Sequence, residues 1–124
     1  MNEFTLKRID ELSSINHGAV KLAADELAVR SFGMQVLDLP AGFTDYPEHD
    51  HAEDGQEEVY VVLAGSAELT VAGERVEAAA GSMVRVDPAA KRKLVPGPDG
   101  ARILAIGGAP DYERPPVFRV AARA

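Results

Sequence analysis

The chain of 124 residues contains no cysteine. A disulfide framework, a thiolate metal site and a thiol nucleophile are therefore all excluded. No apolar run approaches the length of a membrane span, and the N-terminal stretch MNEFTLKRIDEL has no apolar secretory core. From these missing signals we expect a cytoplasmic protein without a membrane partner.

Basic residues are also few. Thirteen Lys and Arg stand against twenty Asp and Glu, which gives a net charge of −7. A nucleic-acid partner is not expected, because binding a phosphate backbone needs a basic footprint. The apolar fraction of 46% and the charged fraction of 27% are those of an ordinary globular protein, and the length fits one domain.

From Ser31 onward the sequence consists of short runs rich in β-branched and aliphatic residues, broken by Gly, Pro and Asp. This punctuation predicts an all-β antiparallel sandwich or barrel over residues 31–108. The predicted strands are 32–39, 57–65, 66–71, 74–78, 82–86, 91–95 and 101–108. Ala72-Gly73 is expected to form a hairpin turn, and the breaker PGPDG at 96–100 is expected to end the strand before it.

The two ends of the chain differ from this central region. Within residues 1–30, LKRIDEL (6–12) fits a short strand or a helical turn, and LAADELAV (22–29) predicts about two helical turns. We expect this N-terminal segment to pack on the barrel. Residues 109–124 contain three prolines and are predicted to form an extended arm, in which VFRVAA (117–122) could add a strand to a sheet edge.

The stretch HDHAEDGQEEVY begins with His49 and His51, two residues apart. In an extended strand alternate side chains emerge on the same face, so both imidazoles can point at one ion. An ordinary charged loop with two solvated histidines is the alternative. In the following strand Gln56, Glu58, Tyr60 and Val62 share one face, and Glu57 lies on the other. An antiparallel return would bring Glu58 opposite the histidines and complete a facial triad for iron(II), manganese or zinc.

With their surroundings these residues resemble the first motif of the cupins: a glycine, then HxH, then a glutamate that is separated by six residues from a second glycine. The matching positions are Gly42, His49, His51, Glu58 and Gly65, and the likeness extends from about Met34 to Gly108. The resemblance implies a single-domain jelly roll, or double-stranded β-helix, that is a homodimer. It also implies a divalent metal ion in the barrel mouth (iron, manganese, zinc or nickel) and a small-molecule ligand.

The second cupin motif departs from this pattern. It should supply a further histidine ligand, but alignment on Gly81 places Arg92 there, and a guanidinium cannot bind metal. His17 matches no motif position. Three interpretations of Arg92 remain open: it pairs bidentately with Glu58, it anchors an anionic group of a substrate beside a three-ligand metal, or it is a solvated member of the run KRK.

Two further residues share the face of Glu58. Gln56 could be a fourth metal ligand or could orient an imidazole, although a loop-polar role is also open. Tyr60 could contact substrate, or could simply fill the core with its hydroxyl satisfied. Besides a structural or partner-binding dimer whose site has decayed, two functions are compatible with the sequence. One is a metal-dependent dioxygenase, isomerase or decarboxylase. The other is a non-catalytic binding or sensor protein, metal-free where Arg92 pairs with Glu58.

Overall fold

A computed structural model describes residues 3–113. The described chain is mainly antiparallel β-sheet with one 3-10 helix and one short α-helix. The elements are η1 (Ile9–Glu11), β1 (Ser14–Ile15), β2 (Val20–Lys21), α1 (Ala23–Leu27), β3 (Gly33–Leu39), β4 (Glu57–Val71), β5 (Glu74–Ala79), β6 (Met83–Val86) and β7 (Arg92–Gly108). Within residues 3–113 no helix is long and apolar enough to cross a membrane.

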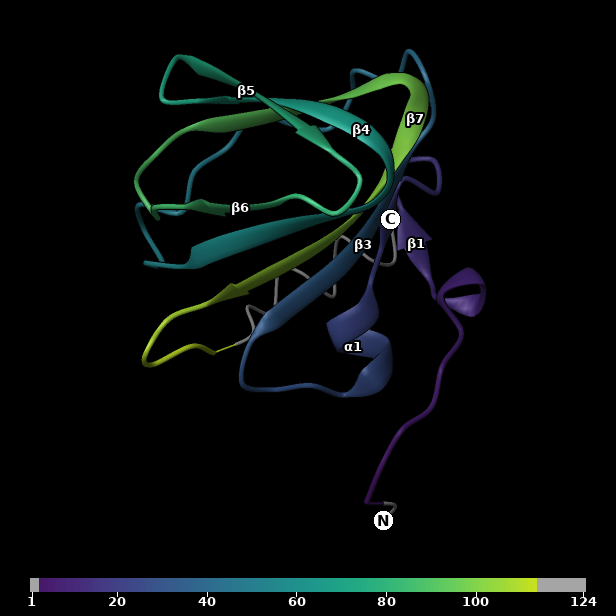
Figure 1. The fold of residues 1–124 in the computed structure, drawn as a ribbon. Coiled ribbons are helices and arrows are strands. Elements are labelled where there is room, and N and C mark those ends of the chain that lie inside the picture. Colours follow the sequence, from purple (N-terminus) through teal and green to yellow (C-terminus); the bar gives the residue numbers. More distant parts are fainter. Residues whose placement is uncertain (1–2, 114–124) are drawn as a thin grey trace.

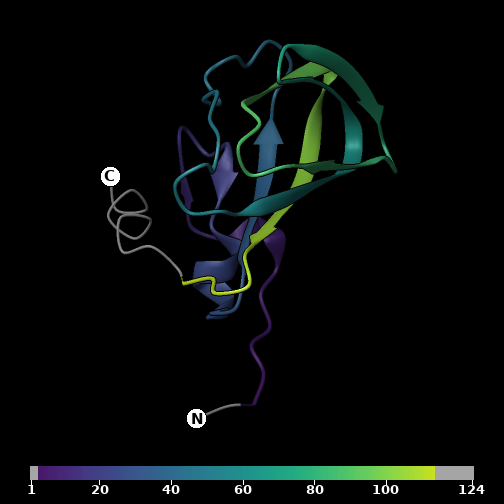
Figure 2. The same cartoon turned by 90° about the vertical axis from the view of Figure 1, so that its left-hand side faces the viewer.

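The long strands β4 and β7 organise the barrel. They pair with each other along most of their length, and β3 pairs with the second half of β7. The first half of β4 also pairs with β6 and its second half with β5, so β4 belongs to both sides of the structure. Figures 1 and 2 show both long strands bending strongly, which closes the sheet into the jelly roll predicted from the sequence.

The sequence predicted breaks that the structure replaces with bulges. The breaker at 96–100 does not end a strand, because β7 runs through it. Gly65 of β4 pairs with Ala101 of β7, whereas Ala67, two residues later, pairs with Pro96. The turn residues therefore form a bulge: they are extra residues on the β7 side of a continuous β4–β7 strand pair. Gly65 has φ +71°, and a Cβ there would collide with the Gly100 carbonyl. The predicted strands 57–65 and 66–71 are accordingly a single strand, β4.

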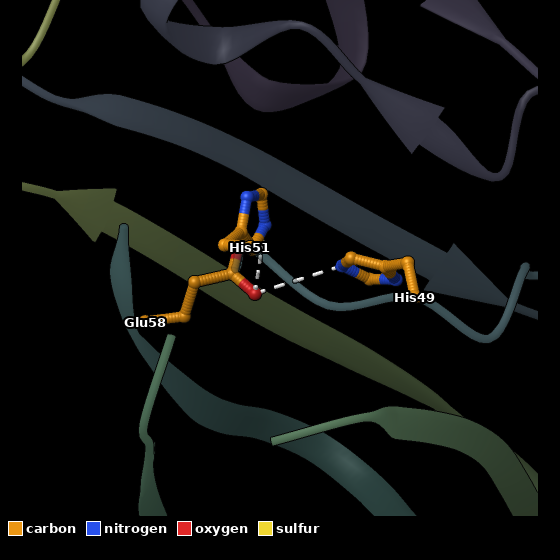
Figure 3. Close-up of side chains that lie close together, drawn as sticks. All are labelled: His49, His51 and Glu58. Atoms are coloured by element: carbon orange, nitrogen blue, oxygen red, sulfur yellow. Dashed lines mark ion pairs between the residues drawn. The ribbon is translucent and has the colours of Figure 1, made fainter. Parts of the chain in front are cut away.

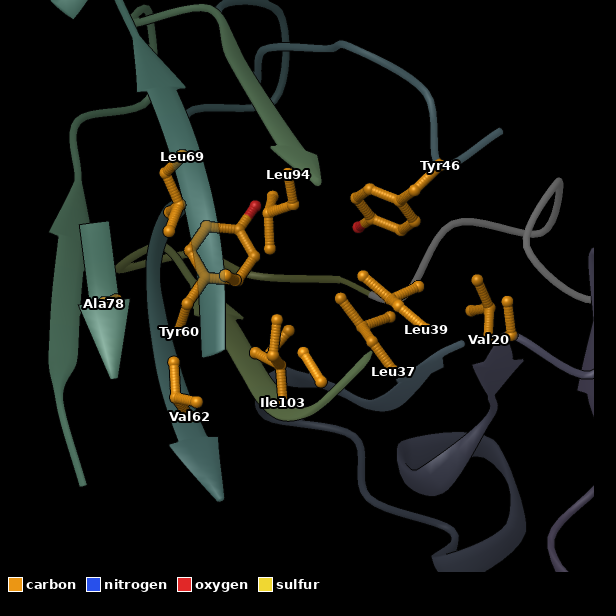
Figure 4. Packing of buried hydrophobic residues seen from close by; sticks show 14 of the residues in the cluster. Val20, Leu37, Leu39, Tyr46, Tyr60, Val62, Leu69, Ala78, Leu94 and Ile103 are labelled. Atoms are coloured by element: carbon orange, nitrogen blue, oxygen red, sulfur yellow. The ribbon is translucent and has the colours of Figure 1, made fainter. Parts of the chain in front are cut away.

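The barrel interior holds the hydrophobic core (Figure 4). Tyr60 and Val62 on β4 face inward and are almost fully buried, whereas Glu57 is exposed, as the predicted alternation requires. Each buried side chain of this size contributes roughly 1.5–3 kcal/mol through removal of apolar surface from water. The largest fully buried apolar side chains are Tyr60, Leu22, Leu37, Leu39, Leu69, Leu94, Ile103, Val62 and Val86.

The N-terminal segment contains a small hairpin that the sequence did not predict. Strands β1 and β2 pair with each other, and β2 pairs with β3, so the hairpin extends the sheet. Its turn has three consecutive left-handed residues, Asn16, His17 and Gly18, with φ of 56°, 59° and 84°. The predicted helical region forms α1, which is shorter than two turns and lies beside β3 (Figure 2). The predicted edge strand 117–122 lies outside the described residues.

Candidate metal centre and cavity

Backbone hydrogen bonds fix the histidine segment against the start of β7. The His49 N–H donates to the Arg92 carbonyl (3.0 Å), the Arg92 N–H donates to the His49 carbonyl (2.8 Å), and the His51 N–H donates to the Pro88 carbonyl (2.7 Å). The sequence predicted a strand antiparallel to the one that carries Glu58. Instead the segment forms an isolated bridge with Arg92. The backbone from His49 to His51 is still extended, so the two imidazoles face the same region.

His49, His51 and Glu58 come together at one point (Figure 3). The Nε2 atoms of His49 and His51 lie 3.6 and 3.4 Å from Oε1 of Glu58. One ligand atom from each of the three residues lies within 4.8 Å of the other two. His17 is exposed in the N-terminal turn and does not belong to this group. The structure thus assembles the three residues that the sequence proposed as metal ligands.

The outer nitrogen of each imidazole has an oxygen partner. Nδ1 of His49 lies 3.0 Å from the Pro47 carbonyl, and Nδ1 of His51 lies 3.1 and 3.2 Å from the carboxylate oxygens of Asp54. An acceptor at Nδ1 selects the tautomer that carries its proton there. This tautomer leaves the Nε2 lone pair available to a metal ion, as a metal-binding imidazole requires; when His51 is protonated, its Nε2 also carries a hydrogen that can be donated to Glu58. The donor chemistry of the three side chains fits a divalent cation.

Gln56 acts on this arrangement through Asp54. Its side-chain amide donates to Oδ2 of Asp54 (2.9 Å), and its backbone N–H donates to Oδ1 (3.2 Å). Gln56 is buried, and its amide nitrogen is engaged with Asp54. Of its two predicted roles, the geometry matches the one in which Gln56 helps to orient an imidazole, here through the carboxylate that holds His51.

Glu58 is held as a carboxylate by several donors. Burial alone would raise its pKa, but the interactions with His49, His51 and Tyr60 outweigh burial and place the pKa well below its usual range. Tyr60 donates its hydroxyl to Oε1 of Glu58 at 2.6 Å. The pKa of Tyr60 is raised, chiefly by burial and further by nearby Tyr46 and Glu58. Tyr60 therefore keeps its proton, and its hydroxyl is satisfied by Glu58.

Arg92 points into the barrel. Its side chain is fully buried, so the solvated role in the KRK run is wrong. Its Nε lies 3.5 Å from Oε1 of Glu58, which is one contact and not the bidentate pair considered from the sequence. Nη2 donates to the Asp87 carbonyl at 3.3 Å, whereas Nε and Nη1 have no hydrogen-bond partner within the described chain.

Tyr46 borders the site and was not predicted from the sequence. Its ring meets the His49 ring edge-on, with centroids 5.8 Å apart, and it is buried. Lys93 fixes the loop that carries it, because Nζ donates to the carbonyls of Thr44, at 2.6 Å, and Tyr46. Burial raises the pKa of Tyr46, with Glu58 adding to the effect. No periodic pattern marks a loop residue of this kind, so the sequence offered no signal for it.

A cavity of about 440 Å³ contains the three converging side chains in its wall. Its lining combines the barrel with the N-terminal segment, and Tyr112 contributes after β7. Neither Arg92 nor Tyr60 lines this cavity. A volume of this size suits a small organic ligand.

Comparison with known proteins places this site in a family. The Cupin domain family (Cupin_2) matches residues 35–107, which is more than half of the chain, and the protein belongs to the cupins. An uncharacterized protein of Streptomyces coelicolor is 31% identical over 111 residues, covering 90% of this chain and 99% of that protein.

Solved structures show the same fold. A cupin protein from Bacteroides fragilis has a TM-score of 0.74 at 26% identity, with 94% of each chain covered. A putative sugar phosphate isomerase from Acidithiobacillus ferrooxidans has a TM-score of 0.60 at 24% identity, covering 74% of this chain and 59% of that one. The second likeness shows the fold alone.

Proposed function

We propose that this cupin binds a divalent metal ion through Nε2 of His49, Nε2 of His51 and the carboxylate of Glu58. The carrying observation is that these ligand atoms lie within 4.8 Å of one another while both Nδ1 atoms have oxygen partners. When bound, the ion supplies a Lewis acid and an attachment point for a small organic molecule in the cavity.

The surrounding residues hold the ligands in place. Asp54 orients the His51 ring, and the Pro47 carbonyl orients the His49 ring. Tyr60 and Arg92 contact Glu58 and do not line the cavity, so they position the carboxylate. The proposed function is therefore metal-dependent binding of a small molecule.

A second candidate is a metal-free binding protein. It is favoured by the 3.5 Å contact between Arg92 and Glu58, because a fixed guanidinium charge competes with a cation for the same carboxylate oxygen. The two candidates share the cavity and differ in whether metal enters the site.

Metal content measured by mass spectrometry on protein without a histidine tag separates the two candidates. We expect near-stoichiometric metal in the wild type and its loss in His51→Ala. His17→Asn is the matched control, because His17 is exposed and asparagine tolerates its left-handed backbone. If wild type and His51→Ala both remain metal-free after incubation with iron, manganese, zinc and nickel, the metal proposal is wrong and the second candidate stands.

We also propose a homodimer formed through the outer face of β4 and β6. Leu63 is 45% exposed and Met83 is 73% exposed, and Val59 and Val61 on the same face are half-buried. When the inward-facing side chains of a sheet are buried and its outward-facing side chains are also apolar, the sheet is typically covered on both sides. A second copy of the chain would provide that cover.

A further inference from the structure

Two acceptor oxygens on the cavity wall face the same point of β7. An ideal Cβ on Gly107 would lie 2.7 Å from Oε1 of Gln56 and 3.5 Å from Oε2 of Glu58. All three residues line the cavity. Because glycine has no side chain, the cavity reaches the backbone here, and the space beside both oxygens is left to a ligand.

The two carboxylate oxygens of Glu58 have different surroundings. Oε1 accepts the hydrogen bond from Tyr60, and it is the oxygen that the Nε2 atoms of His49 and His51 approach (Figure 3). Nε of Arg92 approaches the same atom. Among residues 3–113 no hydrogen bond ends on Oε2. Oε2 therefore keeps its capacity as an acceptor while Oε1 faces the candidate metal ligands.

Asp54 fixes which end of the Gln56 amide faces the cavity. The Gln56 Nε2 donates to Oδ2 of Asp54 at 2.9 Å. Rotating the amide by half a turn would set its oxygen against the carboxylate, which would bring two acceptors together without a proton between them. Oε1 is therefore held toward Gly107. In the described chain this side chain makes hydrogen bonds to Asp54 alone, so Oε1 is a buried acceptor that lacks a donor.

We propose that Oε1 of Gln56 and Oε2 of Glu58 form a subsite for a hydrogen-bond-donating group of the ligand, an N–H or O–H group. Gln56 is then a specificity-determining residue. This inference rests on the proposed function, because it places the subsite in the same cavity, next to the candidate metal ligands. The donor group leaves the open positions of a bound divalent ion to another group of the same ligand, whether that group is neutral or anionic.

Benzamide and acetophenone test the subsite in the wild-type protein. The two molecules have nearly the same shape, are uncharged and carry the same carbonyl group, but benzamide has a donating NH2 where acetophenone has a methyl group. Ile15, Val20 and Ala24 give the cavity an apolar side that suits the phenyl ring of both. We expect calorimetry to show that benzamide binds at least about tenfold more tightly, because acetophenone leaves both acceptors unpaired. Equal affinities, tighter binding of acetophenone or no binding of benzamide overturns the inference.

Adjacent glycines provide a matched pair of variants. An alanine Cβ at Gly107 would press on Oε1 of Gln56, whereas at Gly108 the nearest atom would be Cβ of Phe32 at 3.7 Å, an ordinary contact. We expect Gly107→Ala to bring the ratio of benzamide to acetophenone affinity close to one, and Gly108→Ala to keep the wild-type ratio. A wild-type ratio in folded Gly107→Ala overturns the placement of the subsite.

Gln56→Met removes the amide and keeps a side chain of similar length. Because Gln56 also holds Asp54, this substitution can disturb the wall of the cavity as a whole. A general disturbance weakens both probes equally, whereas loss of the acceptor weakens benzamide and spares acetophenone. We expect the affinity ratio to fall by at least about fivefold. Equal weakening of the two probes overturns the specificity role of Gln56, even if Gly107→Ala fails to fold.

Manganese binding by the wild type separates this inference from the proposed function. The probe ratio is measured in metal-free protein and again after addition of manganese. If the wild type binds no manganese, the metal proposal fails, and the ratio in metal-free protein still decides the subsite. If manganese binds but both probes bind equally in the two preparations, the metal proposal stands and the subsite is wrong.

Discussion

Nε of Arg92 lies 3.5 Å from Oε1 of Glu58, and the arginine side chain is fully buried inside the barrel. The same carboxylate oxygen accepts a hydrogen bond from Tyr60 and faces both imidazoles. In the metal-free protein Glu58 is thus already surrounded by donors. A divalent cation gains Glu58 as a ligand only by competing with these contacts.

The first prediction follows from this competition. Replacing Arg92 by histidine removes a fixed positive charge from beside Glu58 and adds an imidazole that can bind metal. We expect Arg92→His to raise manganese and zinc affinity by about tenfold or more, a magnitude typical of residues that support metal ligands. Competition titration against a chelating dye measures the change.

Arg75→His is the matched control for this substitution. Arg75 is exposed on β5 and pairs with Glu68, away from the cavity. Its metal affinity should equal that of the wild type. Equal affinity in Arg92→His and wild type would show that Arg92 does not oppose the metal.

The alternation of side chains between the two faces of a strand correctly predicted which glutamate belongs to the candidate site. It selected Glu58 over Glu57, and the structure places Glu58 with the histidines and leaves Glu57 exposed. The same rule could have placed Arg92, because Arg92 and Leu94 lie two apart in β7 and are both fully buried. The basic neighbours Lys91 and Lys93 obscured that signal by suggesting a solvated run.

Other features depend on contacts that no local pattern records. The breaker at 96–100 was predicted to end a strand, but long-range pairing with β4 carries β7 through it as a bulge. The position of Tyr46 depends on Lys93, 47 residues later in the chain. Tertiary pairing outweighs local turn preference in both cases.

Asp54 should control metal affinity without touching the metal. Asp54→Asn keeps the size of the side chain but replaces one of the oxygens near Nδ1 of His51 with an amide nitrogen that cannot accept its proton. We expect metal affinity to fall by about 10–100-fold, because a neutral amide oxygen holds the tautomer and orientation of His51 more weakly than the carboxylate does. Calorimetric titration with zinc measures the loss.

Asp50→Asn is the matched control, because it changes the same loop and leaves both histidine contacts intact. This variant should bind zinc like the wild type. A similar loss of zinc affinity in both variants would assign the effect to the loop.

The exposed apolar face of β4 and β6 leads to a prediction about assembly. Met83→Glu and Leu63→Lys place charges where we propose that a second copy packs, so both should convert a dimer into a monomer. Light scattering after gel filtration measures the mass. Glu77→Lys introduces a charge change at an exposed position on β5 and should leave the mass unchanged. A monomeric wild type at micromolar concentration would contradict the proposed interface.

Metal affinity should fall as the solution becomes more acidic. In the metal-free protein the pKa of His51 is raised above its usual value of 6.5, mainly by its hydrogen bond with Glu58; burial lowers it, and the Coulombic attraction of Glu58 and the contacts with Asp54 raise it further. Protonated imidazole cannot bind metal, so apparent affinity should decrease by about tenfold per pH unit below that pKa. The same raised pKa means that protonated His51 stabilises the metal-free fold below pH 6.5, and that this contribution is lost as the pH rises through the folded-state value.

Zinc titrations between pH 5.5 and 8.5 test this pH dependence. Asp54→Asn provides the comparison, because removing one acidic partner of His51 should lower its pKa and move the affinity profile to lower pH. A profile that is flat over this range, or that moves to higher pH in Asp54→Asn, would show that protonation of His51 does not compete with metal. The direction of the shift therefore distinguishes a metal bound through His51 from one bound elsewhere on this acidic chain.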